Sequence, residues 1–212
     1  MAIEPKQTRS ADSMHRMLVA GEELFLIGGP DAIRLDAIIE RAGTSIGSFY
    51  ARFESMEGYL DVLHERALMR IGQSLAPIMA RAAEQSTIER TLHAYVSGFL
   101  KVLRQERETI NFFAVGGTQV PRTRERGAAF VLQTCSALAP LIEPFLARPE
   151  SPDTQRRLDM MLRLLIAMAF QQVMFDQSEV SPLRLSDKEL AESWAASLSS
   201  SLADVTQLNT TR

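Results

Sequence analysis

Residues 34–53, RLDAIIERAGTSIGSFYARF, decide how the surrounding chain is organised. Apolar side chains in the first half recur at i, i+3, i+4 and i+7, the spacing that lines one face of a short helix. They are Leu35, Ile38, Ile39 and Ala42. Gly43 follows directly and can take the left-handed conformation that ends a helix. Ser45 offers a hydroxyl to cap a second short helix.

The second short helix carries Phe49 and Phe53 four residues apart, which places both rings on one buried face. Two short helices joined by a tight turn that contains glycine form a helix-turn-helix, whose second helix lies in the major groove of DNA. The same layout also occurs as an ordinary αα-hairpin inside a helical bundle. Both interpretations stay open on this stretch alone, and DNA binding is favoured.

The flanks of this motif predict further helices. Residues 14–25 follow helical spacing until Gly28-Gly29-Pro30, and Ser55 can cap a helix downstream. With these flanks, the first seventy or so residues resemble the N-terminal domain of the TetR (tetracycline-repressor) family of transcriptional regulators. The matching run is AGEELFLIGGPDAIRLDAIIERAGTSIGSFYARFESMEGYLDVL. Its most specific positions are Glu23-Leu24-Phe25, Gly29, Ile38, Ala42-Gly43, Ser45, Gly47, Tyr50 and Phe53.

The resemblance implies a DNA-contacting surface on the second motif helix. Tyr50 would hydrogen-bond a phosphate, and Gly47 would let the helix N-terminus approach the DNA backbone. A core aromatic with its hydroxyl at the rim is the alternative for Tyr50. Ile46 stands where the family often has lysine, and it could contact a thymine methyl instead. The expected DNA-binding residues are Arg34, Thr44, Ser45, Ile46, Gly47, Ser48, Tyr50 and Arg52.

The charge of this region complicates the DNA hypothesis. Residues 1–70 carry eight basic and eleven acidic side chains, and the whole chain has a formal net charge of −3. Met56 also stands where the family commonly has lysine, whereas Arg34 adds a cation at the start of the first motif helix. A nucleic-acid-binding domain is usually basic on its contact face. Binding therefore requires the arginines to gather on one face, and few phosphate contacts predict a shallow salt dependence.

Composition places the chain among soluble globular proteins, and the absence of strand-like alternation predicts an all-α fold. The hydrophobic fraction is 46% and the charged fraction 23%. No uninterrupted apolar run approaches the ~20 residues that span a bilayer. The N-terminus lacks an apolar signal core. Cys135, the single cysteine, rules out an internal disulfide and fits a reducing cytoplasm. We therefore expect a cytoplasmic protein with no membrane association.

About nine helices in two domains are expected. Residues 8–70 would form a three-helix DNA-binding domain after a loose tail over residues 1–7. Residues 71–212 would form a helical bundle for ligand binding and dimerisation. The fourth helix should run from Tyr59 to about Ser74, with Pro77 interrupting or ending it. A capping box, Ser186 to Glu189, opens the last helix.

The helix expected over residues 153–176 is apolar almost all round between Met160 and Phe175, as in a helix buried in a bundle. Core packing is the default for its methionines, and a deformable ligand cavity is the alternative. The resemblance implies release from DNA by a small effector, and the lining favours an apolar one. The candidate effector-binding residues are Phe99, Leu103, Phe112, Phe113, Met161 and Met168.

A homodimer follows from the DNA hypothesis, because a two-fold dimer reads a palindromic operator with half-sites about one turn apart. The last helix repeats apolar residues every three to four positions, and the resemblance places it with the preceding helix in a four-helix dimer interface. An intramolecular contact would suit the same pattern. The expected interface residues are Met160, Leu164, Leu190, Trp194, Leu198 and Leu202.

Enzymatic chemistry finds no support in the sequence. No nucleophile–base pair, metal cluster or phosphate loop is evident, so no catalytic residue and no cofactor is expected. The pairs Asp12–His15 and Asp61–His64 have a spacing that suits metal ligands, but matching carboxylates on other helices are missing. We expect the residues of both pairs to form surface or inter-helix hydrogen bonds instead. The competing function is a dimeric helical module with a degenerate helix-turn-helix that binds a partner protein rather than DNA.

Overall fold

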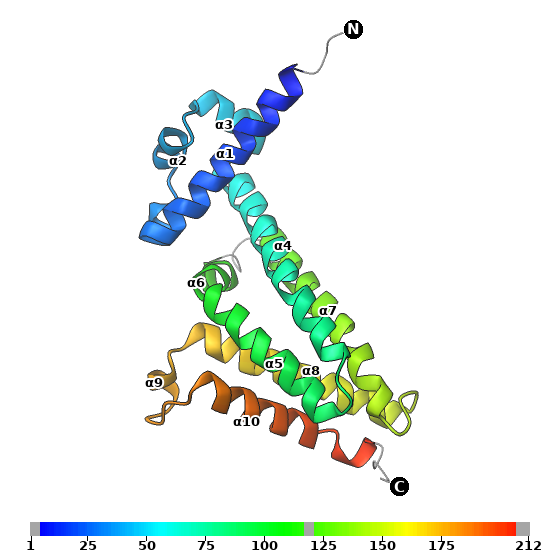
Figure 1. Ribbon diagram of the computed structural model, residues 1–212. Helices are drawn as coiled ribbons and strands as arrows, with labels where there is room; N and C mark the ends of the chain where they lie inside the picture. Colours follow the sequence, from blue (N-terminus) through cyan, green and yellow to red (C-terminus); the bar gives the residue numbers. More distant parts are fainter. Residues whose placement is uncertain (1–4, 117–120, 207–212) are drawn as a thin grey trace.

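The structure, a computed structural model, describes residues 5–116 and 121–206, and these form helices without a β-strand (Figure 1). The all-α prediction is confirmed. The elements in chain order are α1 Pro5–Gly28, η1 Pro30–Ala32, α2 Leu35–Arg41, α3 Ile46–Phe53, α4 Met56–Ala83, α5 Ile88–Gln105, α6 Arg107–Asn111, η2 Phe112–Gly116, α7 Pro121–Ile142, η4 Glu143–Phe145, α8 Pro152–Met174, α9 Gln177–Val180, α10 Asp187–Ser200 and η5 Ala203–Val205.

The N-terminal helices α1, α2 and α3 pack around an aromatic core together with the start of α4 (Figure 1). The rings of Phe49, Phe53 and Tyr59 lie within 5.0–5.3 Å of one another, centroid to centroid. The Tyr59 hydroxyl donates a hydrogen bond to the Met17 carbonyl at 2.9 Å. This buried bond fixes α4 against α1, so the motif is held by the helix that continues into the rest of the chain.

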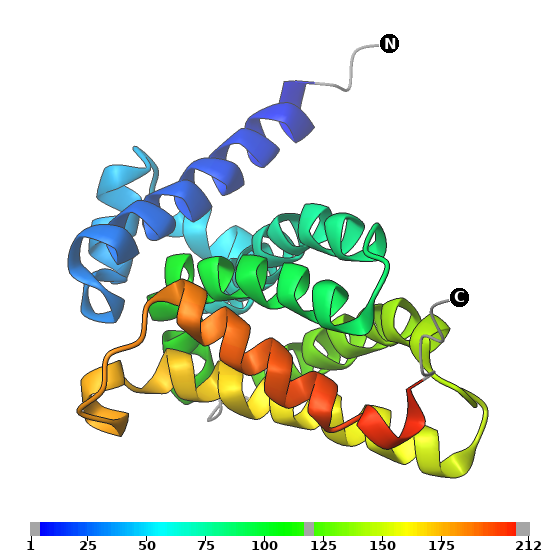
Figure 2. The same ribbon diagram turned by 60° about the horizontal axis from the view of Figure 1, so that its bottom comes forward.

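A second core fills the remaining helices, with α5 lying between α4 and α10 (Figures 1 and 2). The apolar face of α5 that the sequence predicted is buried throughout; it comprises Ile88, Leu92, Tyr95, Phe99, Val102 and Leu103. The helix α8 packs against both α5 and α10, and α7 packs against α4. The two cores are joined by α4, which contributes residues to both.

Three expected helix features are wrong in their details. α1 begins at Pro5, so the tail does not extend to residue 7; proline suits the first turn of a helix because its missing N–H has no partner there. α4 continues through Pro77 to Ala83. Pro77 is exposed while Leu75 and Ile78 are buried, so packing on one face outweighs the lost hydrogen bond on the other.

The sequence predicted that α8 is buried on almost all sides, and this is wrong. Met160, Leu164 and Phe170 are exposed, whereas the opposite face of the helix lies in the core. A short helix that the sequence did not predict, α9, follows, and a capping box from Asp176 to Glu179 begins it.

Length and composition would let one helix of the described chain, Pro121–Phe145, cross a membrane, and a single such helix is weak evidence for a span. Only 11% of the apolar stretch of this helix is buried inside the chain.

Candidate DNA interface and ligand cavity

The turn between α2 and α3 has the geometry that the sequence predicted. Gly43 has a φ of 58°, the left-handed region that glycine adopts without strain. The Thr44 N–H donates to the Ile39 carbonyl at 3.0 Å and closes the end of α2. The Ser45 hydroxyl accepts from the Ser48 N–H at 3.2 Å and caps α3. These local bonds set the direction in which α3 leaves the turn.

One face of α3 is buried and the other is free. Phe49 and Phe53 are in the core, as expected. Ile46 is 53% exposed and Tyr50 45% exposed, so Tyr50 is not a core aromatic. At Gly47 an added Cβ would have no neighbouring atom within 4 Å, which leaves the first turn of α3 open to a close approach. An outward surface of the kind that enters a groove therefore exists on α3.

The arginines near this surface are partly engaged by the chain itself. Arg52 donates to both the backbone carbonyl and the hydroxyl of Ser48, each at 2.7 Å. Arg34 pairs with Asp36 at 3.1 Å in an exposed ion pair, which contributes little free energy and can be exchanged for a phosphate. The sequence did not reveal that Arg16 on α1 donates to the Ala42 carbonyl at 3.1 Å and so supports the turn.

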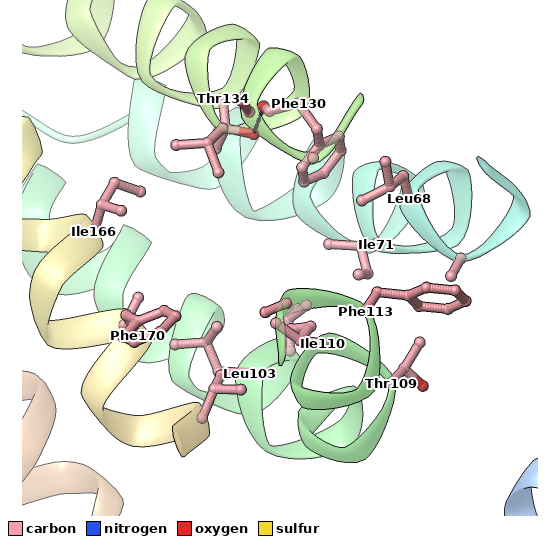
Figure 3. A pocket seen from close by; sticks show the side chains of 18 of the residues that line it. Leu68, Ile71, Leu103, Thr109, Ile110, Phe113, Phe130, Thr134, Ile166 and Phe170 are labelled. Atoms are coloured by element: carbon pink, nitrogen blue, oxygen red, sulfur yellow. Dashed lines mark hydrogen bonds between the residues drawn. The ribbon is translucent and has the colours of Figure 1, made fainter. Parts of the chain in front are cut away.

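A cavity of about 300 Å³ lies among α4, α5, α6, α7 and α8 (Figure 3). Of the expected effector residues, Phe99, Leu103 and Phe113 line it. Its other apolar walls include Phe170, which belongs to the deformable lining expected from the sequence, and residues that were not expected there, namely Ile110, Phe130, Val131, Ile166 and Val173. Leu68 and Ile71 of α4 also line the cavity. The cavity therefore contacts the helix that packs against the helix-turn-helix motif.

The other three expected effector residues lie elsewhere. Met161 is fully buried in the core, and Met168 packs against that core. Phe112 lies 5.6 Å from Phe25 of α1, ring centroid to ring centroid, and fills the junction between α6 and α1. An apolar stripe on a helix does not reveal whether it faces other side chains or a void, which is why the sequence misplaced them.

His64 is the polar group buried deepest in the cavity wall. It is 5% exposed, and its Nδ1 atom has no hydrogen-bond partner. The Phe113 ring lies against it at 4.4 Å. Asp61 takes part in an inter-helix hydrogen bond of the expected kind, because Arg126 of α7 donates to its carboxylate at 2.6 Å, whereas Nδ1 of His64 has no partner. Among the residues that the structure describes, no group of three His, Cys, Asp or Glu could hold a metal ion.

Burial lowers the pKa of His64 to about 4, and the nearby Arg126 adds to this effect, so the imidazole is neutral at pH 7. Because this pKa lies below the ordinary value of 6.5 in the unfolded chain, the stability it contributes is lost as the pH falls from 6.5 toward 4. We expect His64→Leu to gain about 2 kcal/mol of stability relative to the wild type on going from pH 7.5 to pH 5. Urea unfolding at both pH values measures this, and parallel pH profiles for the two proteins would contradict it.

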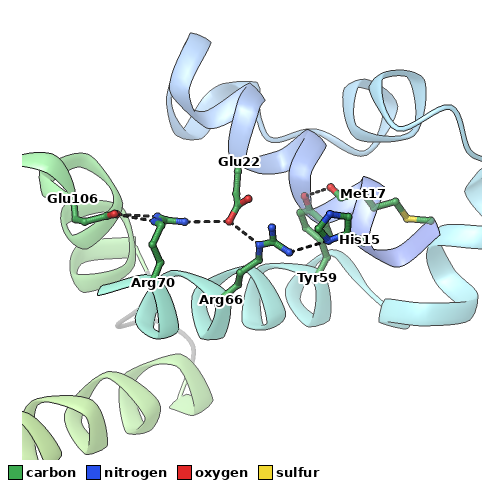
Figure 4. A network of polar contacts seen from close by, with 7 residues as sticks. All are labelled: His15, Met17, Glu22, Tyr59, Arg66, Arg70 and Glu106. Carbon is green, nitrogen blue, oxygen red and sulfur yellow. Dashed lines mark hydrogen bonds and ion pairs between the residues drawn. The ribbon is translucent and has the colours of Figure 1, made fainter. Parts of the chain in front are cut away.

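A network of charged side chains joins α1, α4 and the α5–α6 junction (Figure 4). Glu22 of α1 accepts from Arg66 at 2.9 Å and from Arg70 at 3.1 Å. Arg70 also donates two hydrogen bonds of 2.8 Å to Glu106, the residue between α5 and α6. Three helices that are distant in sequence are therefore connected next to the cavity, and sequence spacing gave no signal of this.

The outward α3, capped by the turn from α2 and braced by α1, defines a helix-turn-helix protein of the DNA-binding class. Residues 17–62 match the family model of bacterial regulatory proteins of the tetR family. The resemblance to this family that was noted in the sequence is therefore confirmed over these residues.

Solved structures extend this likeness to the fold of the whole chain. A Mesorhizobium loti protein assigned to the TetR family shares 17% identity at a TM-score of 0.71, over 94% of this chain and 99% of that one. A transcriptional regulator from Rhodococcus shares 15% identity at 0.67, over 92% and 99%. A TetR/AcrR-family regulator from Thermobifida fusca shares 19% identity at 0.63, over 88% and 96%. No curated protein sequence matches the chain.

Proposed function

We propose that this chain is a cytoplasmic repressor that binds a palindromic operator as a homodimer and is released when a small apolar molecule enters the cavity. Residues 8–70 would bind DNA, and residues 71–212 would bind the effector and the second copy. The observation that carries the proposal is the position of the cavity, whose wall includes the α4 helix that holds the motif. A ligand that favours one position of α4 would shift the population away from the DNA-binding conformer.

At the DNA, the outward face of α3 would enter the major groove. Ile46 would contact base methyl groups, and the Tyr50 hydroxyl would reach a phosphate beside the open helix end at Gly47. Thr44, Ser45 and Ser48 offer hydroxyls on the same side. Arg34 and Arg52 would pair with phosphates in exchange for their present partners in the chain.

Two paths support coupling between the cavity and the motif. The first runs through rings in tilted contact, from Phe113 in the cavity wall to Phe112 at 4.8 Å and then to Phe25 on α1 at 5.6 Å, centroid to centroid. The second is the charged network of Figure 4, in which Arg70 connects Glu106 with Glu22. A shift of α6 caused by a ligand would reach α1 through both.

The exposed apolar faces of α7 and α8 support a homodimer. Leu132 on α7 is 68% exposed, and Met160 and Leu164 on α8 are 54% and 43% exposed. Large apolar side chains exposed on neighbouring turns of a helix favour an interaction site, and a second copy of the chain supplies a matching surface by symmetry. Of the interface expected from the sequence, only Met160 and Leu164 enter this proposal. The remaining residues, Leu190, Trp194, Leu198 and Leu202, are buried in the core of the single chain.

We expect Leu164→Asp to convert the dimer into monomers, because a carboxylate buried without a partner in an apolar interface costs several kcal/mol. Sedimentation velocity measures the change in mass, and operator affinity should fall with it. Leu183→Asp is the matched control, since Leu183 is 66% exposed in the segment between α9 and α10. A Leu164→Asp protein that remains dimeric would place the interface elsewhere.

A gel shift with the DNA upstream of the gene, at increasing salt, tests the DNA-binding function. We expect a retarded band at low salt that weakens gradually, because few arginines are free to pair with phosphate. The absence of any band at the lowest salt would favour the partner-protein function. Arg34 and Arg41 form ion pairs with acidic residues of the same domain. This observation favours the second function, because arginines paired in this way are less available to phosphates.

A further inference from the structure

One residue that lines the cavity, His64, has an imidazole nitrogen without a hydrogen-bond partner. His64 is buried, and its Nδ1 atom accepts or donates no hydrogen bond. A buried polar atom without a partner carries a free-energy penalty, because it has lost its hydrogen bond to water. Most of the surrounding wall is apolar, so a ligand that brings one hydrogen-bonding group to His64 would remove this penalty.

The charges around His64 do not favour an anionic ligand. Burial keeps its imidazole neutral at pH 7. The guanidinium of Arg126 is already neutralised by Asp61, through contacts of 2.6 Å to the carboxylate and 2.8 Å to the backbone carbonyl. Arg124 lines the cavity from an exposed position, where water solvates it. A carboxylate placed at His64 would therefore lose its hydration without gaining a buried cation.

A hydroxyl suits this site better than a carbonyl. A neutral imidazole has one donor and one acceptor nitrogen, and the tautomer decides which is which. A hydroxyl can donate or accept, so it can pair with Nδ1 of His64 in either tautomer once the imidazole turns this buried atom toward the cavity, whereas a carbonyl oxygen only accepts. Four phenylalanine rings, Phe99, Phe113, Phe130 and Phe170, surround the space beyond and favour an aromatic body.

We propose that the effector is a neutral, compact, lipophilic hydroxyl compound, such as a phenol, whose hydroxyl hydrogen-bonds to His64 while its ring occupies the apolar cavity. This inference rests on the proposed function of the cavity as the effector site. The volume of about 300 Å³ lies at the small end of ligand sites, so the compound has one or two rings. Its hydroxyl would act on α4 itself, one turn before Leu68.

Three probes with the same body test the proposal by titration calorimetry on the full chain at pH 7.5 without DNA. They are 4-tert-butylphenol, tert-butylbenzene and 4-tert-butylbenzoate. We expect the phenol to bind about tenfold more tightly than the hydrocarbon, and the benzoate to bind most weakly. In His64→Leu the phenol should lose this advantage while the hydrocarbon binds as before. His64→Gln, which keeps a hydrogen-bonding group, should restore part of it.

His93→Leu is the matched control, because His93 is exposed on α5, and it should leave all three affinities unchanged. Equal binding of phenol and hydrocarbon in the wild type would overturn the proposal, as would a benzoate that binds most tightly or a failure of all three to bind. The gel shift is performed without ligand. If a retarded band is seen there while calorimetry gives one of these contrary results, the ligand class is rejected and the DNA-binding function is not.

Discussion

Ile46→Glu is expected to weaken operator binding about 100-fold while leaving the fold stable. The side chain is 53% exposed on the outward face of α3, so its replacement leaves no cavity in the core. A glutamate there would repel phosphates and remove an apolar contact with a base. Each dimer carries the change twice, which multiplies its effect on affinity.

Fluorescence anisotropy with a labelled operator measures this loss, and thermal unfolding checks the fold. Leu183→Glu serves as the control, because it introduces the same charge at an exposed leucine of the segment between α9 and α10. Wild-type affinity in Ile46→Glu would mean that α3 does not face the DNA.

Gly21→Ala is expected to destabilise the chain by about 3 kcal/mol, the upper part of the range for overpacked cores. A Cβ at position 21 would overlap the Tyr59 hydroxyl and lie 2.9 Å from Cζ of that ring. The ring is fully buried and held by its hydrogen bond to the Met17 carbonyl, so it has no free space to move into. At a solvent-exposed position inside a helix the same change would stabilise the chain by about 1 kcal/mol, because alanine forms helices better than glycine.

The double variant separates this clash from other causes. Tyr59→Phe alone should cost about 1 kcal/mol through the lost hydrogen bond. In that background Gly21→Ala should cost less than about 1 kcal/mol, because the overlapping oxygen is gone. Urea unfolding of the four proteins gives the coupling energy. An equal cost of Gly21→Ala in both backgrounds would show that Tyr59 does not restrict the approach of α1 to α4.

Features that depend on neighbouring residues could be predicted from the sequence. The left-handed Gly43 and the caps at Ser45 and Ser55 follow from local conformational rules, and the structure contains all three. The buried face of α5 follows from helical spacing in the same way. The outward position of Tyr50 followed only from the family resemblance, because its residue type suits a core equally well.

Features that depend on packing between distant helices could not be predicted. The apolar repeat of α10 predicts a face for another helix, and α5 of the same chain takes that place. The void beside Phe130 and Phe170 exists because the helices around it diverge, which no spacing encodes. The unpaired Nδ1 of His64 likewise results from Arg126, 62 positions further on, which pairs with Asp61 and leaves the imidazole alone.

Selection of binding sites from a random duplex library tests the outward, paired arrangement of α3 most directly. We predict an enriched palindrome whose half-sites lie about one helical turn apart, ~34–36 Å, bound by two chains. A library that shows no enrichment at low salt, or a single unrepeated site bound by one chain, would contradict it.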